Sequence, residues 1–482
     1  MLIAPPEVRL PTRDAVERAV RELDRRLGPS KVDVSEARRE AHARDDSAAA
    51  GRLPDAVVLA EGRDDVRVAL EVCEKHAVPV TPRAAGTGRT GGAVPVAGGV
   101  VLATQGMASI VDIDRHDLVA VVQPGVVTGA LHAAVEAEGL FYPPDPNSLS
   151  SCMIGGNVAE NAGGPRAFKY GVTRDYVLGL EACLMGGRVL RTGRRTIKGV
   201  TGYDVTSLLV GSEGTLGVFT EIALRLVHAP TEIATVLALY SDVAAAAAAV
   251  TRVIARGLVP RCLELMDAWS LEAIRRQGVS IDLRASAMLL VEVDARSAGG
   301  GGSASLDATL EALGETLSEG GHAIDVVAAQ DEAQRARLWE ARRMLSMATR
   351  KLAKYKLSED VVVPRSRLVA LLDEAARVCE REGVRHLTYG HAGDGNMHVN
   401  FLWDDDGERP AVDRAIEGLM RATVELGGTL SGEHGIGVSK AAYLPLEQGP
   451  ELIGLQQDLK RVFDPSGLLN PGKIFPTGHR AC

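Results

Sequence analysis

The 482-residue chain contains few aromatic residues and no excess of positive charge. Phenylalanine, tryptophan and tyrosine make up 4% of the sequence, whereas hydrophobic residues make up 46%. The formal net charge of -9 argues against nucleic-acid binding as the main task, because a nucleic-acid partner needs a basic surface. A chain of this length and apolar content can bury two or three ordinary hydrophobic cores.

Cysteine is also scarce, and its spacing carries no metal-binding pattern. This excludes an iron–sulfur cluster held by this chain and predicts reduced thiols in a cytosolic protein. The sequence has no secretory leader and no apolar run of membrane-spanning length. We therefore expect a cytoplasmic protein, with peripheral docking to the inner face of a membrane left open. The six cysteines stand singly, without a CxxC pair: Cys73, Cys152, Cys183, Cys262, Cys379 and Cys482.

Three of the eleven histidines, in contrast, lie in two short glycine-rich segments near the C-terminus. Residues 389–401 read YGHAGDGNMHVNF, and residues 431–437 read SGEHGIG. The first segment predicts a strand, a sharp turn at residues 393–395 and a second strand. Because side chains alternate along a strand, His391 and His398 can converge across this turn.

The two histidines and Glu433 would form a set that suits a divalent cation and leaves positions open for water or substrate. His434 is then a better free base than a fourth ligand. A histidine in a glycine-rich loop is commonly a hydrogen-bonded structural group. Four such residues in two short segments favour a metal or proton-transfer site instead.

A glycine-rich loop lies upstream, at residues 81–93, with the sequence TPRAAGTGRTGGA. It follows an apolar run at residues 76–80 that predicts a strand. Backbone amides of such a loop can approach a diphosphate closely, because glycine carries no Cβ. It is not a Walker loop, since no Gly-Lys-Ser/Thr follows. Gly86, Gly88 and Gly91 fit GxGxxG without a clear ribose-binding acid, so a simple flexible turn remains an alternative.

Two further glycine-rich regions follow this loop. Residues 142–181 begin with a rigid Pro-Pro-Asp-Pro turn and contain two Gly-Gly pairs. Such a segment can lie flat against a planar, polar ring system and donate backbone amides to it. Residues 210–226 run from a glycine-punctuated loop into an alternating strand.

The order of these segments resembles the flavoproteins of the vanillyl-alcohol oxidase or PCMH type. More narrowly, it resembles the FAD-linked D-2-hydroxy-acid dehydrogenases, the group that includes the glycolate oxidase catalytic subunit, D-lactate dehydrogenase and D-2-hydroxyglutarate dehydrogenase. The resemblance extends from about Leu53 to Pro476 and ends in VFDPSGLLNPGKIF, residues 462–475.

The resemblance implies an α+β fold in three parts. Residues 1–50 would form an N-terminal helical arm, in which Arg13 to Gly28 show helical spacing. Residues 51–230 would form a PCMH-type FAD-binding domain of two α/β subdomains. Residues 231–482 would form a C-terminal α+β cap domain with an antiparallel sheet and a tail returning to the flavin domain.

The resemblance also implies which residues bind FAD, and it implies non-covalent binding because the first loop contains no histidine. Those holding the pyrophosphate would be Pro82, Arg83, Ala84, Ala85, Gly86, Thr87, Gly88, Thr90, Gly91 and Gly92. Those bordering the flavin and ribityl chain would be Pro144, Asp145, Ser148, Ser151, Ile154, Gly155, Gly156, Asn161, Gly163 and Gly164. The adenine and ribose side would be completed by Tyr170, Gly171, Glu213, Gly217 and Val218, and Asn470 would reach back towards the ring.

The same resemblance assigns the metal and substrate residues. It makes His391, His398 and Glu433 the ligands of a divalent metal, Zn or Mn, and His434 the catalytic base. Asn400 would contact the substrate. Arg342, in LWEARR, would clamp the substrate carboxylate. Lys356 could add a second positive charge, although a structural surface lysine is the alternative there.

The expected activity is FAD-dependent oxidation of a D-2-hydroxy acid to the 2-oxo acid, with hydride transfer to the flavin. Two rival functions are weighed beside it. One is an alkylglycerone-phosphate synthase-like flavin transferase, and the other is a non-catalytic flavin subunit of a larger complex. The candidates for the electron acceptor are a quinone, a cytochrome, an electron-transfer flavoprotein and a partner subunit, and the sequence does not choose among them. It also does not decide whether the protein is a homodimer.

Several elements of the cap domain can also be predicted from local sequence. Six alanines at residues 244–249 favour a helix, and residues 368–382 are amphipathic at helical spacing. Residues 288–295 predict a buried strand. The run SAGGGGSAS at residues 297–305 predicts a flexible, poorly ordered surface loop without a function.

Overall fold

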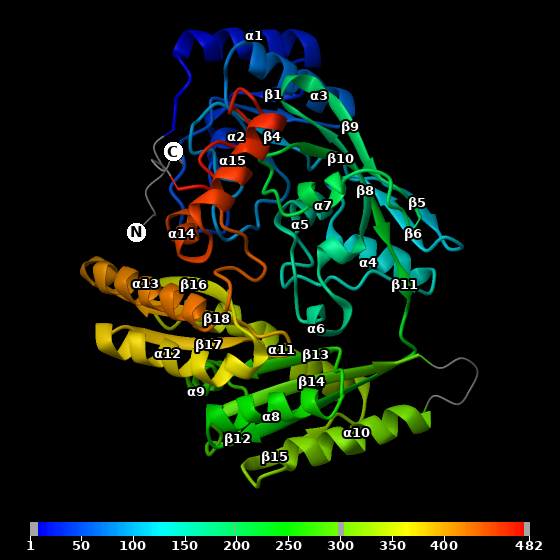
Figure 1. The fold of residues 1–482 in the computed structure, drawn as a ribbon, viewed down its shortest axis with the longest axis vertical. Coiled ribbons are helices and arrows are strands. Elements are labelled where there is room, and N and C mark those ends of the chain that lie inside the picture. Colours follow the sequence, from blue (N-terminus) through cyan, green and yellow to red (C-terminus); the bar gives the residue numbers. More distant parts are fainter. Residues whose placement is uncertain (1–7, 197, 297–302, 477–482) are drawn as a thin grey trace. The chain divides into compact units, whose positions relative to one another are not determined.

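The computed structural model describes residues 8–196, 198–296 and 303–476, which form two compact units (Figure 1). The first unit contains the described residues up to 162, residues 172–228 and residues from 433 onward. The second unit contains residues 163–171 and the described part of residues 229–432.

A four-stranded sheet forms one subdomain of the first unit, with strand order β1-β2-β4-β3. Strands β2, β4 and β3 are parallel, and β1 pairs antiparallel with β2. Helix α1 buries Ala19 and Leu23 in the hydrophobic core that this sheet also lines, and the side chain of Thr12 caps the first turn of the helix. The elements are α1 (Arg13–Leu27), β1 (Val32–Asp33), α2 (Glu36–Ala41), β2 (Ala56–Leu59), α3 (Arg63–Lys75), β3 (Val80–Arg83) and β4 (Val100–Ala103).

The strand predicted at residues 76–80 is wrong in its position. Helix α3 extends to Lys75, His76 caps it, and Ala77 has a positive φ of 55°. Residues 76–79 therefore turn the chain back, and the strand is Val80–Arg83, which begins at the last residue of the predicted strand and continues into the predicted loop.

A five-stranded antiparallel sheet forms the second subdomain, with order β5-β6-β10-β8-β9, so the two predicted α/β subdomains are present. Its strands are β5 (Ile110–Asp114), β6 (Val119–Val122), β8 (Val177–Cys183), β9 (Val189–Gly193) and β10 (Val218–Arg225), and the pair β7 (Leu140–Phe141) and β11 (Val227–His228) lies apart. The helices of this part are α4 (Thr128–Ala137), α5 (Ile154–Glu160), α7 (Val205–Leu209), α14 (Leu444–Glu447) and α15 (Pro450–Phe463).

The second unit is built on a seven-stranded sheet, in which every neighbouring pair is antiparallel, as predicted. The strand order is β15-β12-β14-β13-β17-β18-β16. The strands are β12 (Glu232–Tyr240), β13 (Cys262–Met266), β14 (Ala287–Ala295), β15 (Ala323–Ala328), β16 (Tyr355–Val362), β17 (Arg385–His391) and β18 (Asn396–Trp403).

Helices cover this sheet. Helices α9 and α11 pack with Met266, Leu290 and Tyr389 of the sheet into one core, and helices α8, α10, α12 and α13 form a separate layer (Figure 1). The helices are α6 (Ala167–Tyr170), α8 (Val243–Ala255), α9 (Ala268–Arg275), α10 (Ser303–Ser318), α11 (Glu332–Arg350), α12 (Leu368–Glu382) and α13 (Arg409–Glu425).

The locally predicted elements of this unit are largely confirmed. The alanine run lies in α8, residues 288–295 lie in β14, and residues 368–382 are α12. The predicted loop at residues 297–305 is wrong for its last three residues, since α10 begins at Ser303. Residues 297–302 lie outside the described part of the chain.

Two expectations from composition can be compared with the described residues. Five of the six cysteines are free and buried, and Cys482 lies outside the described range. None of the described helices is both long enough and apolar enough to span a bilayer.

Candidate functional site

The histidine hairpin, strands β17 and β18 with the turn between them, brings two predicted ligands together. Tyr389 pairs with His398 and His391 pairs with Asn396, so these four side chains share one face of the sheet. The ring centroids of His391 and His398 lie 5.3 Å apart at a nearly perpendicular angle of 87°. Both rings are buried. The convergence follows from strand alternation across a short turn.

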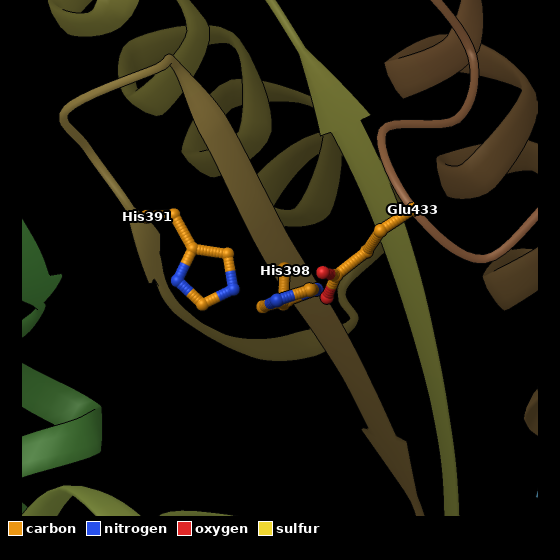
Figure 2. Close-up of side chains that lie close together, drawn as sticks. All are labelled: His391, His398 and Glu433. Atoms are coloured by element: carbon orange, nitrogen blue, oxygen red, sulfur yellow. The ribbon is translucent and has the colours of Figure 1, made fainter. Parts of the chain in front are cut away.

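Glu433 completes a group of three possible metal ligands. One ligand atom from each of His391, His398 and Glu433 lies within 4.8 Å of the others. Figure 2 shows the Glu433 carboxylate beside the ring of His398, with one ring nitrogen of His391 turned toward both. Two imidazoles and a carboxylate at this spacing suit a divalent cation.

The backbone before Glu433 is held by Asp360, a fully buried residue of β16. The Gly432 amide donates to Asp360 Oδ2 at 2.8 Å, and Ser431 Oγ donates to Asp360 Oδ1 at 3.2 Å. A Cβ on Gly432 would lie 2.2 Å from Asn396 Nδ2, so only glycine fits there. These contacts fix the backbone at Gly432, and therefore the point from which the chain continues to Glu433.

A buried carboxylate, Glu264 of β13, joins His391 to Arg342. Its Oε1 lies 2.5 Å from His391 Nδ1, and its Oε2 accepts a hydrogen bond from Arg342 Nε at 2.7 Å. Burial by itself raises the pKa of Glu264, but the charges and hydrogen bonds of His391 and Arg342 outweigh it and hold that pKa below its ordinary value.

The predicted substrate residues share the ligand-bearing region of the sheet. Arg342, on α11, is buried, and its guanidinium carbon lies 4.9 Å from the centre of the Tyr389 ring. Asp360 pairs with His398 and Ser358 pairs with Asn400, so alternation places Lys356 and Asn400 on the same face as the ligands. Lys356 is half-buried there.

Asn400 is fully buried, and only its amide nitrogen is used in a described hydrogen bond. Nδ2 donates to the His398 carbonyl at 2.9 Å. Within the described chain, the Oδ1 atom has no hydrogen-bond partner. A buried acceptor left in this way is suited to receive a hydroxyl or amide donor from a ligand.

His434, the predicted base, lies next to Glu433 in the first unit. Its Nε2 is 3.8 Å from Glu433 Oε1. Its carbonyl accepts a hydrogen bond from Thr90 Oγ1 at 2.9 Å, and the Val438 amide donates to the Thr90 carbonyl at 2.8 Å. The segment that carries the base is therefore bonded directly to the glycine loop.

Glu213, predicted on the adenine and ribose side, has a buried carboxylate that binds the same segment. Its two oxygens accept hydrogen bonds from the amides of Ile436 and Gly437, both at 2.7 Å. Burial raises the pKa of Glu213 despite these amide bonds.

The glycine loop of residues 84–92 follows β3, which ends with Pro82 and Arg83. Gly86 and Gly91 have φ values of +73° and +88°, which side-chain-bearing residues rarely adopt. Within the described chain, Arg83 Nη1 is buried without a hydrogen-bond partner. A buried guanidinium beside a glycine loop suits an anionic diphosphate.

Residues 468–470, near the C-terminus, contact β3 and this loop. The amide of Val80 donates to the Leu468 carbonyl, and the Asn470 amide donates to the Val80 carbonyl, so residues 468–470 lie along β3. Asn470 Nδ2 donates to the carbonyls of Gly92 at 2.9 Å and Glu213 at 2.8 Å. In the described contacts, then, Asn470 reaches back to the loop backbone.

Lys473 adds a buried cation to the same place. Its Nζ donates to the Val94 carbonyl at 2.7 Å and to Asn470 Oδ1 at 3.0 Å. Burial lowers the pKa of Lys473 to about 7, although the carboxylates of Asp45, Glu213 and Glu160 oppose that shift.

The second predicted flavin segment is folded around α5. The amides of Ile154 and Gly155 donate to the carbonyls of Val126 and Pro124, which fixes the start of the helix. Asn161 ends it in a left-handed conformation, with φ 56°. A Cβ on Gly217 would lie 3.4 Å from Ala182 Cβ, so Gly217 and Val218 pack closely on β8. Of the remaining predicted residues, Gly156 lies within α5, Ser148 and Ser151 lie in the turn before it, and Pro144 and Asp145 lie in the irregular segment that leads to that turn.

Four residues predicted to border FAD belong to the second unit instead of the first: Gly163, Gly164, Tyr170 and Gly171. The Tyr170 hydroxyl donates to Asp294 Oδ2 at 2.7 Å, and Lys169 forms an ion pair with the same carboxylate. This hydroxyl is thus bonded to strand β14.

Sequence reasoning missed Glu264 and Asp360. Glu264 lies in the fully buried strand CLELM of β13, and Asp360 lies in the buried stretch Glu359–Val361 of β16. A charged residue within such a strand is a signal for a site, because a buried charge requires a partner. The identity of the partner could not be read from the sequence.

Two family descriptions match successive parts of the chain. A family described as "FAD binding domain" matches residues 54–193, and one described as "FAD linked oxidases, C-terminal domain" matches residues 229–474. The glycolate oxidase subunit GlcD of Bacillus subtilis (strain 168) is 41% identical, over 93% of this chain and 94% of that protein. A D-lactate dehydrogenase of Anaerostipes hadrus is 34% identical, over 93% and 95% respectively.

Among solved structures, p-cresol methylhydroxylase matches with a TM-score of 0.81 and 17% identity, over 98% of this chain and 99% of that chain. This likeness concerns the fold. The sequence relatives go further, since they match nearly from end to end and are named as an oxidase subunit and a dehydrogenase. The predicted family is confirmed, and the protein is an FAD-dependent oxidoreductase that belongs to the FAD-linked oxidases.

Proposed function

We propose that this protein oxidises a D-2-hydroxy acid of the lactate, glycolate or 2-hydroxyglutarate class to the 2-oxo acid, with a divalent metal, Zn or Mn, beside the flavin. The observation that carries the proposal is the ligand set His391, His398 and Glu433, whose ligand atoms lie within 4.8 Å of one another. A 2-hydroxy acid offers two oxygens on adjacent carbons, a chelating pair that suits an open metal site. The names of the relatives, glycolate oxidase subunit and D-lactate dehydrogenase, support the same substrate class.

Each group of the site has a distinct task in this proposal. FAD, when bound, supplies the hydride acceptor, and a divalent cation supplies a positive charge that lowers the pKa of a hydroxyl. His434 takes the hydroxyl proton, because its ring lies beside Glu433 without being one of the three ligands.

The substrate carboxylate is oriented by cations. Arg342 Nε donates a hydrogen bond to Glu264, so the direction of the guanidinium group is fixed before any substrate binds. Lys356 adds a second positive charge from the same face of the sheet. Asn400 Oδ1 offers a buried acceptor to a donor on the substrate.

A flavin reduced in this way would need an electron acceptor outside this chain. A quinone, a cytochrome, an electron-transfer flavoprotein or a partner subunit would serve, and the word "subunit" in the name of GlcD favours the last for that relative. We propose the cytoplasm as the location, with docking at the inner face of a membrane as the arrangement that reaches a quinone.

The experiment is an anaerobic screen of the FAD-loaded protein against D- and L-2-hydroxy acids, followed by turnover with an artificial dye acceptor. We expect one D-acid to bleach the flavin absorbance rapidly and its L-enantiomer to do so far more slowly. A flavin that no hydroxy acid reduces would overturn the proposal and favour a transferase or a non-catalytic subunit. His391→Ala serves as the control that retains flavin.

A further inference from the structure

The side chain of Glu264 lies at a junction of three elements of the second unit. It is fully buried on β13, and its two oxygens contact His391 on β17 and Arg342 on α11. One partner is a predicted metal ligand and the other is the predicted clamp for the substrate carboxylate. A single carboxylate thus contacts both groups.

The contact with His391 is set by the backbone of the sheet. Glu264 pairs directly with His391 across the antiparallel strands β13 and β17. The turn residue Gly393 continues this junction, since its amide donates to the Leu263 carbonyl at 3.2 Å. The position of Glu264 relative to the imidazole is therefore fixed before a metal binds.

The contact also selects one form of the imidazole. A carboxylate at 2.5 Å from Nδ1 accepts a hydrogen bond from that nitrogen, so in the neutral imidazole, the form that binds metal, the lone pair lies on Nε2. In Figure 2, one ring nitrogen of His391 is turned toward His398 and Glu433 and the other is turned away from them. The selected tautomer is the one that can ligate a metal.

We propose that Glu264 is a positioning residue that holds His391 in its Nδ1-protonated form for metal binding and at the same time fixes the direction of Arg342. This rests on the proposed function, because it assumes that His391 is a ligand. It assigns to Glu264 a role in both metal affinity and substrate affinity, although Glu264 touches neither metal nor substrate.

The sheet offers a matched control in Glu292. This residue of β14 is also buried and also contacts an arginine, Arg261, at 3.2 Å. It pairs with Cys262, two residues before Glu264 on β13, so both acids lie on the same face. Its other contacts are Trp339 and Thr235, and neither is a predicted site residue.

The test compares Glu264→Gln with Glu292→Gln in the FAD-loaded protein, by calorimetric titration with Mn²⁺ or Zn²⁺ in the absence of substrate. We expect Glu264→Gln to weaken metal affinity about 10- to 100-fold, as loss of a carboxylate behind a ligating histidine typically does. Glu292→Gln should bind metal like the wild type. Side-chain ¹⁵N spectra of labelled histidine should show an Nδ1-protonated His391 in the wild type and a mixture of tautomers in Glu264→Gln.

A second variant controls for misfolding, because Glu264→Gln removes the negative charge that pairs with the buried guanidinium of Arg342 and could therefore destabilise the fold. Glu264→Gln combined with Arg342→Met removes both charges and should show the same metal defect. Arg342→Met alone should raise KM for the hydroxy acid with a smaller change in metal affinity. Wild-type metal affinity in both Glu264 variants would overturn the inference.

The same titration distinguishes this failure from failure of the proposed function. If His391→Ala loses metal while the Glu264 variants keep it, the metal site stands and only the role of Glu264 is wrong. If His391→Ala itself binds metal normally, His391 is not a ligand, and the proposed metal-assisted function fails together with the role of Glu264.

Discussion

The glycine loop of the first unit and the histidine hairpin of the second are built in opposite ways. The loop is held by backbone groups, with the carbonyls of Thr90 and Gly92 bonded to later parts of the chain. The hairpin carries its chemistry on side chains, with His391 and His398 converging and Glu264 behind them.

A substitution should therefore have opposite effects in the glycine loop and in the histidine hairpin. In the loop, a new side chain adds atoms where we propose that the cofactor approaches. In the hairpin, a smaller side chain removes a proposed metal ligand without changing the glycine loop. Cofactor retention and turnover should therefore be separable by mutation.

The largest expected effect is at the hairpin. His391→Ala or His398→Ala should abolish turnover, because each removes one of three proposed ligands, while the flavin absorbance stays at the wild-type level. Metal content, flavin content and dye reduction measured on the same samples check this. A thoroughly metal-depleted wild type with full activity would reduce the histidines to hydrogen-bonding groups.

The reverse effect is expected in the loop. Gly88→Val should lose FAD, while the protein remains folded, because the nearest protein atom to an added Cβ is 3.7 Å away. Gly91→Val is less informative, since its Cβ would lie 2.7 Å from Ala49 Cβ at a φ of +88°. Gly62→Val, in open space at an extended φ, is the matched control. Stoichiometric FAD in Gly88→Val would contradict the loop assignment.

Glu433, a proposed ligand, and His434, the proposed base, are neighbours in sequence, so their variants separate the two roles. Glu433→Gln should lose metal and recover partly in excess metal. His434→Ala should keep metal but reduce the flavin about 10² to 10⁴ times more slowly, and its rate should lose the acidic limb of the pH profile. Metal analysis with rapid-mixing reduction decides between the roles. An empty metal site in His434→Ala would mean that they are exchanged.

The smallest expected effect concerns stability near the loop. Burial lowers the pKa of Lys473 to about 7, so above that pH the folded protein releases a proton that the unfolded chain keeps. The free energy of unfolding should therefore rise with pH between 7 and 9, by about 2 kcal/mol from this group. Lys473→Met should lack that rise. Urea unfolding of the wild type and of Lys473→Met at pH 7 and pH 9 measures this rise. An equal change in the free energy of unfolding of both proteins would contradict the prediction.

Local patterns predicted the parts of the fold that depend on neighbours in sequence. The hairpin at residues 385–403 could be predicted because a glycine turn separates two alternating strands. Helix α8 could be predicted from alanine content alone. The strand expected at residues 76–80 failed because apolar composition did not distinguish the turn after α3 from the strand that follows it.

Contacts between distant parts of the chain were beyond such patterns. Glu264 reaches His391 across 127 positions, through a pairing of β13 with β17 that has no local signal. Residues 163–171 belong to the second unit through Lys169 and Tyr170, which meet Asp294 more than 120 positions later. Family resemblance supplied the candidate ligands and bases, but not the carboxylates behind them.

The strand-like run of residues 468–470 beside β3 has a consequence for how the protein is made. During synthesis β3 and the glycine loop emerge early, yet the β3 edge stays unpaired until Leu468 and Asn470 have left the ribosome. The carbonyls of Gly92 and Glu213 likewise receive their hydrogen bonds from Asn470 Nδ2 only after Asn470 has been synthesised. Capture of the flavin is thus expected to be a late, post-translational event, and nascent chains stalled before residue 468 should be poor in cofactor.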